Sequence, residues 1–176
     1  MKKIVFIFLF MASIMSAQNT KRDSLWMLLK PFVGTRKGQG EGEPGIGNYE
    51  RNYQFILNKR FIEIRNKSTY PPTTHHPNGE LHEDIGYFSY DNGRKTFMLR
   101  QFHVEGFVNQ FKLDSVSPDK KTLVFITESI KNIPAGFRAK ETYRILSDGE
   151  IEETFEIAEP GKEFSVYSKV QLVRQK

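Results

Sequence analysis

The chain has 176 residues, with 26 lysines and arginines against 21 aspartates and glutamates, and therefore a formal net charge of +5. This length predicts one domain that is large enough to bury its own core. The absence of cysteine excludes a disulfide scaffold, a thiolate metal site, a cysteine nucleophile and a lipidated N-terminal cysteine.

The first 17 residues have the order of a secretory signal peptide. Lys2 and Lys3 form a basic start, residues 4–15 are almost entirely apolar, and Ser16-Ala17 supplies the small residues of a cleavage site. The apolar run is shorter than the about 20 residues that a membrane span needs, so we predict removal after Ala17. We therefore expect an exported protein, periplasmic or secreted, whose net charge falls to +3 without Lys2 and Lys3.

The residues that follow predict a short helix and then an unbroken series of strands. Residues 18–30 form an N-terminal segment in which Leu25, Trp26 and Leu29 give a short helix an apolar face, and residues 31–176 form the barrel domain. Apolar and polar residues alternate in about ten segments, as in half-buried strands. The predicted strands are Phe32–Gly40, Tyr49–Leu57, Arg60–Tyr70, His82–Tyr90, Lys95–Val104, Phe107–Val116, Thr122–Ile130, Arg138–Leu146, Glu150–Ile157 and Phe164–Val173.

Tight-turn sequences such as Asp91-Asn92-Gly93 and Ser147-Asp148-Gly149 separate most of these strands, and only residues 71–81 form a long connection. Short hairpins make neighbouring strands antiparallel, and a meander of this length closes most simply into a barrel that leaves no exposed edge. The predicted fold class is all-β: an antiparallel up-and-down β-barrel of about ten strands, calycin-like or lipocalin-like, with a short N-terminal helix.

A barrel that binds a ligand combines aromatic side chains with a few polar groups that point inward. Mixed strand faces of this kind supply the candidates, and Trp26 is added because the N-terminal helix could gate the barrel. Alternation alone leaves open which face of each strand lies inside. The candidate ligand-binding residues from these faces are Trp26, Arg65, Gln101, His103, Asn109, Phe111, Glu141 and Tyr143.

Other kinds of site find little support in the sequence. The histidines within residues 75–82 match no zinc-ligand spacing, so we interpret them as a solvated loop and predict no metal site. Glu152, Glu153 and Glu156 are interpreted as a solvated strand face. Catalytic motifs for nucleophiles, phosphates or zinc are absent. Basic residues are scattered among acidic ones, so we predict no nucleic-acid partner, and no run after the signal approaches a membrane span.

The most distinctive segment is glycine-rich. Gly34, Gly38, Gly40 and Gly42 share one phase of the first predicted strand, so that another backbone or a ligand can approach it closely. This segment cannot bind phosphate as a P-loop does, because no lysine with serine or threonine follows it.

From Leu25 to Arg174 the sequence resembles the nitrobindin-like haem-binding β-barrels, which are relatives in fold of the fatty-acid-binding proteins. The family opens with Gly-x-Trp-x-Gly-x-Gly, and this chain has Gly34, Gly38 and Gly40 in place but Arg36 at the tryptophan position. Residues 49–51, 82–88 and 167–174 are similar to the family's second strand, its Glu-x-Gly-Phe strand and its last strand. The resemblance implies a ten-stranded barrel, in agreement with the strand count.

The resemblance also implies haem as a cofactor and nitric oxide or peroxynitrite as the reactant. Haem-binding members carry an axial histidine on the last strand, whereas this chain has no histidine after His103. Tyr167 falls near that place, with Lys169 on its face, and tyrosine can ligate ferric haem. Tyr167 is therefore added to the candidate ligand-binding residues.

Three functions follow from these observations. The first is an exported barrel that binds a small hydrophobic or amphipathic molecule and has no catalytic residue. The second is the haem-binding barrel that the resemblance implies. The third is an enzyme that uses His103, Glu141 and Tyr143 for acid–base chemistry at the barrel mouth, because these side chains exchange protons.

Overall fold

The computed structural model describes residues 23–176, and the predicted signal peptide lies outside the described residues. The chain divides into one compact unit that ends at Pro31 and a second that runs from Phe32 to Lys176. None of the described helices is long and apolar enough to cross a membrane.

The N-terminal helix is only a few residues long. A helical turn at residues 23–25 leads into the 3₁₀ helix η1 (Trp26–Leu28), and the Leu29 N–H donates to the Trp26 carbonyl oxygen at 3.0 Å. A second 3₁₀ turn, η2 (Lys30–Phe32), precedes the first strand. Trp26 thus occupies the short helix that the sequence predicts.

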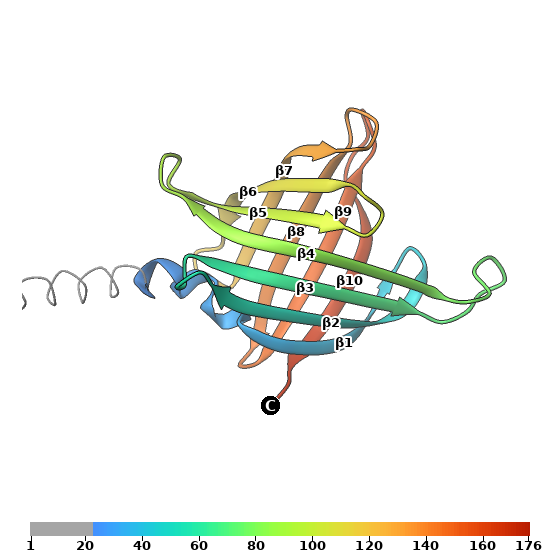
Figure 1. Ribbon diagram of the computed structural model, residues 1–176, viewed down its shortest axis with the longest axis horizontal. Helices are drawn as coiled ribbons and strands as arrows, with labels where there is room; N and C mark the ends of the chain where they lie inside the picture. The colour runs from blue at the N-terminus through green and yellow to red at the C-terminus, as the bar shows by residue number, and fades with distance from the viewer. Residues whose placement is uncertain (1–22) are drawn as a thin grey trace, which may run out of the picture. The chain divides into compact units, whose positions relative to one another are not determined.

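The second unit is a closed antiparallel barrel in which each strand pairs with its neighbours in the chain and β1 pairs with β10 (Figure 1). This confirms the predicted fold class. The strands are β1 (Gly34–Gly42), β2 (Gly45–Ile56), β3 (Phe61–Tyr70), β4 (Glu80–Asp91), β5 (Thr96–His103), β6 (Val108–Val116), β7 (Thr122–Lys131), β8 (Arg138–Ser147), β9 (Glu150–Ala158) and β10 (Ser165–Arg174).

The largest difference from the predicted strand boundaries lies at the start of β2. The sequence predicts a start at Tyr49, but β2 begins at Gly45 and pairs with β1 from there onward, with Gly42 opposite Gly45. Two glycines among the first three residues of β2 give no apolar alternation, so the local pattern could not reveal this part of the strand.

The glycines of β1 allow β10 to approach closely and complete the barrel. A Cβ atom on Gly38 would lie 1.8 Å from the carbonyl oxygen of Gln171, and one on Gly40 would lie 2.4 Å from the carbonyl oxygen of Lys169. Of the two partners that the sequence allows for this glycine face, the structure therefore shows a neighbouring backbone.

The interior changes character along the barrel axis. On β3 the inward residues near the β2–β3 turn are Ile62 and Ile64, whereas the inward residues near the β3–β4 loop are Asn66, Ser68 and Tyr70. Half of the barrel is therefore filled by apolar side chains, and the other half carries polar groups around an open space.

Aromatic side chains pack the apolar half. Phe32 meets Tyr143 with ring centroids 5.6 Å apart, and Phe88 lies 5.3 Å from Phe125 and 5.9 Å from Tyr143. Phe32, Phe88 and Phe125 are 1% exposed or less, and Tyr143 is also buried, so this cluster forms a floor beneath the polar half.

Arg36 is also buried, at the position where the resembled family has tryptophan. Its Nε donates to the carbonyl oxygen of Phe32 at 3.2 Å, and its Nη1 donates to the carbonyl oxygen of Gly149 at 2.7 Å. Burial, followed by the nearby charge of Arg174, lowers the pKa of Arg36. The guanidinium thus connects β1 to the β8–β9 turn at the packed end of the barrel.

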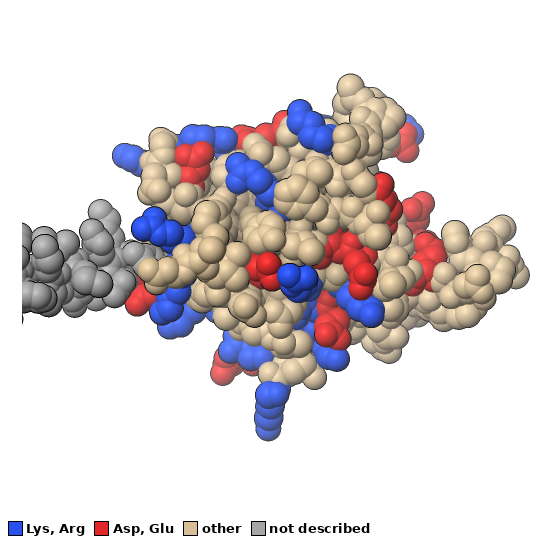
Figure 2. All heavy atoms as spheres, in the orientation of Figure 1, with Lys and Arg blue, Asp and Glu red and all other residues tan. Residues whose placement is uncertain are grey.

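The outer surface carries charges of both signs. On the face shown in Figure 2 basic and acidic side chains are interspersed, with acidic side chains gathered toward the side of the β3–β4 loop. Cross-strand ion pairs such as Lys37–Glu50 (2.7 Å) and Lys140–Glu156 (2.8 Å) link neighbouring strands on this surface.

Candidate functional site

The polar half of the barrel encloses a cavity of about 290 Å³. Its lining comes from β2, β3, β4, β5, β8, β9 and β10, so that residues distant in the sequence face one another across it. The cavity opens between the β3–β4 loop and the β5–β6 turn, at the end where Tyr70, His103 and Phe107 lie. It therefore combines a closed aromatic floor with an open mouth.

Five of the nine residues predicted from the sequence line this cavity. They are Gln101, His103, Glu141, Tyr143 and Tyr167, and they come from β5, β8 and β10. The mixed faces of β5 and β8 supplied Gln101, His103, Glu141 and Tyr143, whereas Tyr167 was predicted from the family resemblance.

His103 is held in a defined orientation. Its ring stacks on Phe107 with centroids 4.0 Å apart and planes at 16°, and its Nε2 lies 3.2 Å from Nδ2 of Asn109. Burial lowers the pKa of His103 to about 4, against a weaker opposite effect of Glu105. The ring is therefore neutral near pH 7, and Nε2 accepts the hydrogen bond because an amide nitrogen only donates.

The remaining predicted residues lie elsewhere. Arg65 is exposed on the outer face of β3, where its Nε lies 2.9 Å from Oε1 of Glu63, because Ile62, Ile64 and Asn66 occupy the inner face. Arg65 thus lies outside the barrel cavity and lines a hollow on the outer surface with Asn52 and Lys67, and its role in ligand binding stays a prediction. Phe111 is fully buried in the packed core, and Asn109 supports His103 without lining the cavity.

The centre of the cavity wall is an ion pair that the sequence did not reveal. Arg51 Nε lies 2.9 Å from Oε2 of Glu153, and the Tyr53 hydroxyl donates to the other carboxylate oxygen of Glu153. Arg51 Nη1 also lies near the Glu50 and Lys67 carbonyl oxygens, at 3.1 and 3.2 Å. The donors at Nε and Nη1 of this buried guanidinium are thus used within the protein.

The interpretation of Glu153 as part of a solvated face is wrong. Glu153 is 7% exposed and shares the inner face of β9 with Ile151 and Phe155, whereas Glu152 faces the other way and pairs with Arg144 at 2.9 Å and with Lys169 at 3.3 Å. The spacing of Ile151, Glu153 and Phe155 was a usable signal, because one glutamate between two apolar residues on a strand face indicates an inward carboxylate.

Two further carboxyl groups reach the cavity and hold protons more tightly than usual. Burial raises the pKa of Asp84 to about 6, although Arg51 and a hydrogen bond from Asn66 lower it. Burial, followed by the charges of Glu153 and Asp84, raises the pKa of Glu141 well above its ordinary value. Together with Glu83, Glu105 and Glu153, these two residues make five acidic side chains in the lining of one cavity, and the single arginine of the lining is already paired.

Two amide side chains of the lining have a buried oxygen that accepts no hydrogen bond from any described residue. Asn66 Nδ2 donates to Oδ1 of Asp84 at 2.7 Å, and the Gln101 side chain hydrogen-bonds to Glu141. These donor contacts turn the NH₂ groups toward the carboxyl groups and leave Asn66 Oδ1 and Gln101 Oε1 without partners. The two oxygens are therefore unpaired acceptors with less than 1 Å² of exposed surface, on side chains of the cavity lining.

Tyr167 does not fit the role of a haem ligand. A β-bulge between Val166 and Ser168 turns Tyr167 into the cavity against Phe155, whereas Lys169 is exposed and pairs with Glu152, so Lys169 does not share its face. Burial raises the pKa of Tyr167, and Glu43, Glu80 and Glu105 raise it further. These groups hold the phenol protonated, whereas ligation of ferric iron requires the phenolate.

The histidines near the mouth interact with carboxylates. His82 Nδ1 lies 2.7 Å from Oε1 of Glu105, and His82 Nε2 lies 3.1 Å from Oε2 of Glu80, whose other carboxylate oxygen lies 3.5 Å from His76 Nε2. Within residues 23–176 no three His, Asp or Glu side chains converge as ligands for a metal ion.

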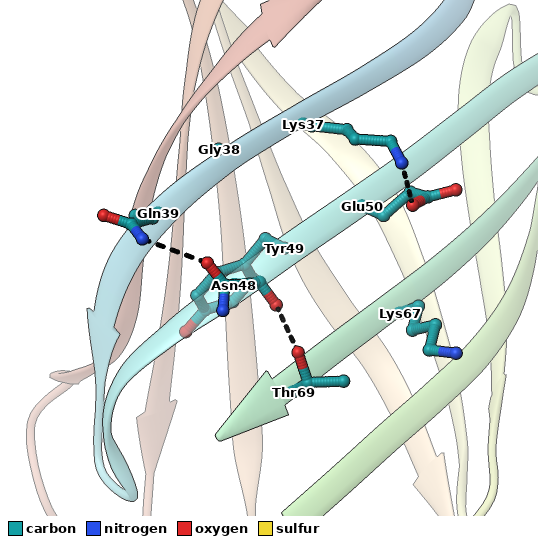
Figure 3. A pocket seen from close by; sticks show the side chains of 8 residues that line it. All are labelled: Lys37, Gly38, Gln39, Asn48, Tyr49, Glu50, Lys67 and Thr69. Atoms are coloured by element: carbon teal, nitrogen blue, oxygen red, sulfur yellow. Dashed lines mark hydrogen bonds and ion pairs between the residues drawn. The ribbon is translucent and has the colours of Figure 1, made fainter. Parts of the chain in front are cut away.

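A second hollow, on the outer surface of β1, β2 and β3, has a different character (Figure 3). Lys37 and Glu50 form an ion pair across it, and Gln39 Nε2 donates to Oδ1 of Asn48 at 3.0 Å. These side chains interact with one another across neighbouring strands, so the hollow is part of the outer sheet surface.

Fold and cavity together define a calycin-like β-barrel with an internal polar chamber. The sequence matches no family model and no curated protein sequence. Among solved structures, the Rv2717c protein of M. tuberculosis aligns with a TM-score of 0.62 at 16% identity, over 86% of this chain and 98% of that chain. This likeness shows that the two chains share the barrel fold.

Two fluorescence-related barrels align less well. A de novo designed fluorescence-activating β-barrel gives a TM-score of 0.43 at 14% identity, over 83% of this chain and 95% of its own. The barrel EF1p2_mFAP2b bound to DFHBI gives 0.44 at 11% identity, over 84% of this chain and 96% of its own.

Proposed function

We propose that this protein binds a small amphipathic molecule inside its barrel. The supporting observation is the cavity of about 290 Å³, built from buried polar groups above a packed aromatic floor. Buried polar groups cost free energy unless they are partnered, and a barrel of this size can be filled entirely by apolar side chains. A polar chamber inside a small barrel is therefore best explained by a ligand.

The composition of the wall favours an amphipathic ligand over a purely hydrophobic one. Phe107, Phe155 and Tyr167 supply aromatic surface near the mouth, whereas Gln101 and Glu141 supply polar groups deeper inside. An apolar ligand would leave the polar groups without partners, and this would cost affinity.

Organic extraction and mass spectrometry of the freshly purified protein test this proposal. Ser168→Phe adds a ring to the cavity wall, and Arg65→Ala serves as the matched control because Arg65 lies on the outer face. We expect one molecule in extracts of the wild type and of Arg65→Ala, and much less of it from Ser168→Phe. Equal amounts from all three proteins would contradict binding in the cavity.

We propose further that the protein is exported, on the sequence of residues 1–17 alone. Intact-mass measurement of the protein recovered from a bacterial periplasm tests this, with an expected N-terminus at Gln18. Absence of the protein from the periplasm, with Met1 retained on the protein in the cytoplasm, would contradict export.

Haem-dependent chemistry is not part of the proposal, because the surroundings of Tyr167 raise the pKa of its phenol and hold it protonated. The acid–base enzyme stays a prediction. His103, Glu141 and Tyr143 line the same cavity, and the opposite pKa shifts of His103 and Glu141 suit a base and an acid. Turnover of a metabolite that His103→Gln abolishes would support it, and the absence of turnover by a ligand-binding wild type would contradict it.

A further inference from the structure

We propose that the ligand is an organic cation with N–H donors, whose charged group is held by Asp84 and Glu141 and by the carbonyl oxygens of Asn66 and Gln101. This inference rests on the proposed function and names the class of ligand.

The first argument is the direction of the unsatisfied hydrogen bonds. Both orphaned side-chain atoms of the cavity lining, Asn66 Oδ1 and Gln101 Oε1, are acceptors. Gln101 is 2% exposed, its NH₂ group is already directed at Glu141, and its oxygen has less than 1 Å² of exposed surface, so a donor in the cavity reaches this oxygen when the side chain turns toward it. A ligand with several N–H groups supplies such a donor.

The second argument is the charge of the wall. The lining carries five carboxyl groups, whereas no lysine and only one arginine, Arg51, are among its described residues. The acidic residues are Glu83, Asp84, Glu105, Glu141 and Glu153. Arg51 forms an ion pair with Glu153, so its charge is already balanced. Asp84 and Glu141 have no cation of their own, and a positively charged ligand would stabilise their ionised forms.

The third argument concerns the ligands that this wall disfavours. A fatty acid or another carboxylate would need a free cation, but the Nε and Nη1 donors of Arg51 already contact Glu153, Ser68 and main-chain oxygens. The ligand's carboxylate would then share the cavity with the carboxylate of Glu153, and like charges close together in a poorly solvated space repel strongly.

The aromatic walls suit the same ligand class. Phe107, Phe155 and Tyr167 surround the path from the mouth to the carboxyl groups and can contact the apolar part of a cation or the face of its charged group. The acidic side chains Glu80 and Glu105 lie beside this path, as their effect on the pKa of Tyr167 indicates. A cation therefore meets favourable potential at the mouth as well as inside.

Binding should also release protons near neutral pH, because a bound cation favours the ionised forms of Asp84 and Glu141. The charged or titratable groups that act on these two carboxyl groups belong to several strands. Arg51 and Glu153 act on both carboxyl groups, and Glu105 acts on Asp84. Asn66 donates a hydrogen bond to Asp84, and Gln101 donates one to Glu141.

Calorimetry with a charge-matched series tests the inference. The probes are 2-phenylethylamine, 2-phenylethanol and phenylacetate, which share a ring and differ in the charge of the polar end. We expect the amine to bind at least about tenfold more tightly than the alcohol, as one additional charge-assisted hydrogen bond would provide, and phenylacetate to bind weakest. Titration of the amine in buffers of different ionisation enthalpy should show net proton release.

Two variants test whether Glu141 and Asp84 bind the charged group of the amine. Glu141→Gln should weaken amine binding about tenfold or more and leave alcohol binding within about twofold, and Asp84→Asn is a second variant in case Glu141→Gln does not fold. Glu152→Gln is the matched control, since Glu152 lies on the other face of β9 from Glu153 and pairs with Arg144 and Lys169.

The outcomes separate this inference from the proposed function. If phenylacetate or the alcohol binds as tightly as the amine, or if both Glu141→Gln and Asp84→Asn leave amine affinity unchanged, the cation inference is overturned and cavity binding stands. If none of the three probes binds and extraction yields no molecule, both proposals fail.

Discussion

Arg51 and Glu153 form an ion pair inside the barrel, with Nε 2.9 Å from Oε2, although 102 residues separate them in the chain. Arg51 lies on β2 and Glu153 on β9, and both side chains are at most 10% exposed. The pair joins two strands that are separated by β1 and β10 in the closed barrel, and it sets the polar character of the cavity. It is therefore both a structural contact and part of the site.

We expect Glu153→Leu to destabilise the protein by about 3–5 kcal/mol, because it leaves the buried guanidinium of Arg51 without its counter-charge. The double variant Arg51→Met/Glu153→Leu should lose less than about 2 kcal/mol, since no buried charge remains there. Urea unfolding of the two variants and the wild type gives both values. Equal losses in the single and double variants would contradict the assigned pairing.

Closure of the barrel between β1 and β10 should depend on Gly38. A Cβ atom there would lie 1.8 Å from the Gln171 carbonyl oxygen, so Gly38→Ala should cost about 3 kcal/mol or more, or prevent folding. Gly93→Ala is the control, because its Cβ would meet only a side-chain oxygen of Asp91, at 3.4 Å. Thermal unfolding compares the two variants. Similar melting temperatures would show that the pairing of β10 with β1 does not depend on the missing side chain at Gly38.

Asp84 should make the protein less stable as the pH rises. Its pKa rises from 3.8 to about 6 on folding, so the folded state binds the proton more tightly than the unfolded state. The contribution is fully present below about pH 3.8 and is lost as the pH passes about 6, and it amounts to about 3 kcal/mol.

Urea unfolding of the wild type and of Asp84→Asn between pH 4 and pH 7 measures this contribution. The free energy of unfolding of the wild type should fall relative to that of Asp84→Asn as the pH rises. His103 acts in the opposite sense, because its lowered pKa costs stability as the pH falls from 6.5 toward 4, and it is present in both proteins. A difference independent of pH would contradict the assigned shift.

His103 should remain neutral well below pH 6, because burial lowers its pKa to about 4. The ring ¹⁵N chemical shifts, assigned with His103→Gln, report its protonation directly. We expect one protonated and one acceptor nitrogen at pH 6, with Nε2 as the acceptor opposite Asn109. A midpoint near 6.5 would mean that the ring is solvated and does not form the wall of the cavity.

The barrel was predictable because its connections are short. Alternation gave ten strands close to the observed ones, and turns such as residues 147–149 made neighbours antiparallel. The start of β2 was missed because Gly45 and Gly47 carry no side-chain pattern. Local alternation does not show which face of a strand is turned inward, so the features that depend on that choice could not be predicted.

The site was predictable to the same degree. Gln101, His103 and Glu141 were found because their strand faces mix polar and apolar residues, whereas the outward position of Arg65 follows from the choice between two faces of β3. Arg51 and Glu153 meet only when the barrel closes through β1 and β10 and brings β2 and β9 within reach of each other. No local spacing encodes that contact.

The central claim, that an amphipathic organic cation enters the barrel, is tested most directly by NMR of the side-chain amides during titration with 2-phenylethylamine. The amide resonances of Gln101 and Asn66 should shift with saturation, while those of Gln39 and Asn48, in the outer hollow, should not. Saturable shifts confined to Gln39 and Asn48, or no saturable shift at Gln101 and Asn66, would contradict binding of this cation in the barrel.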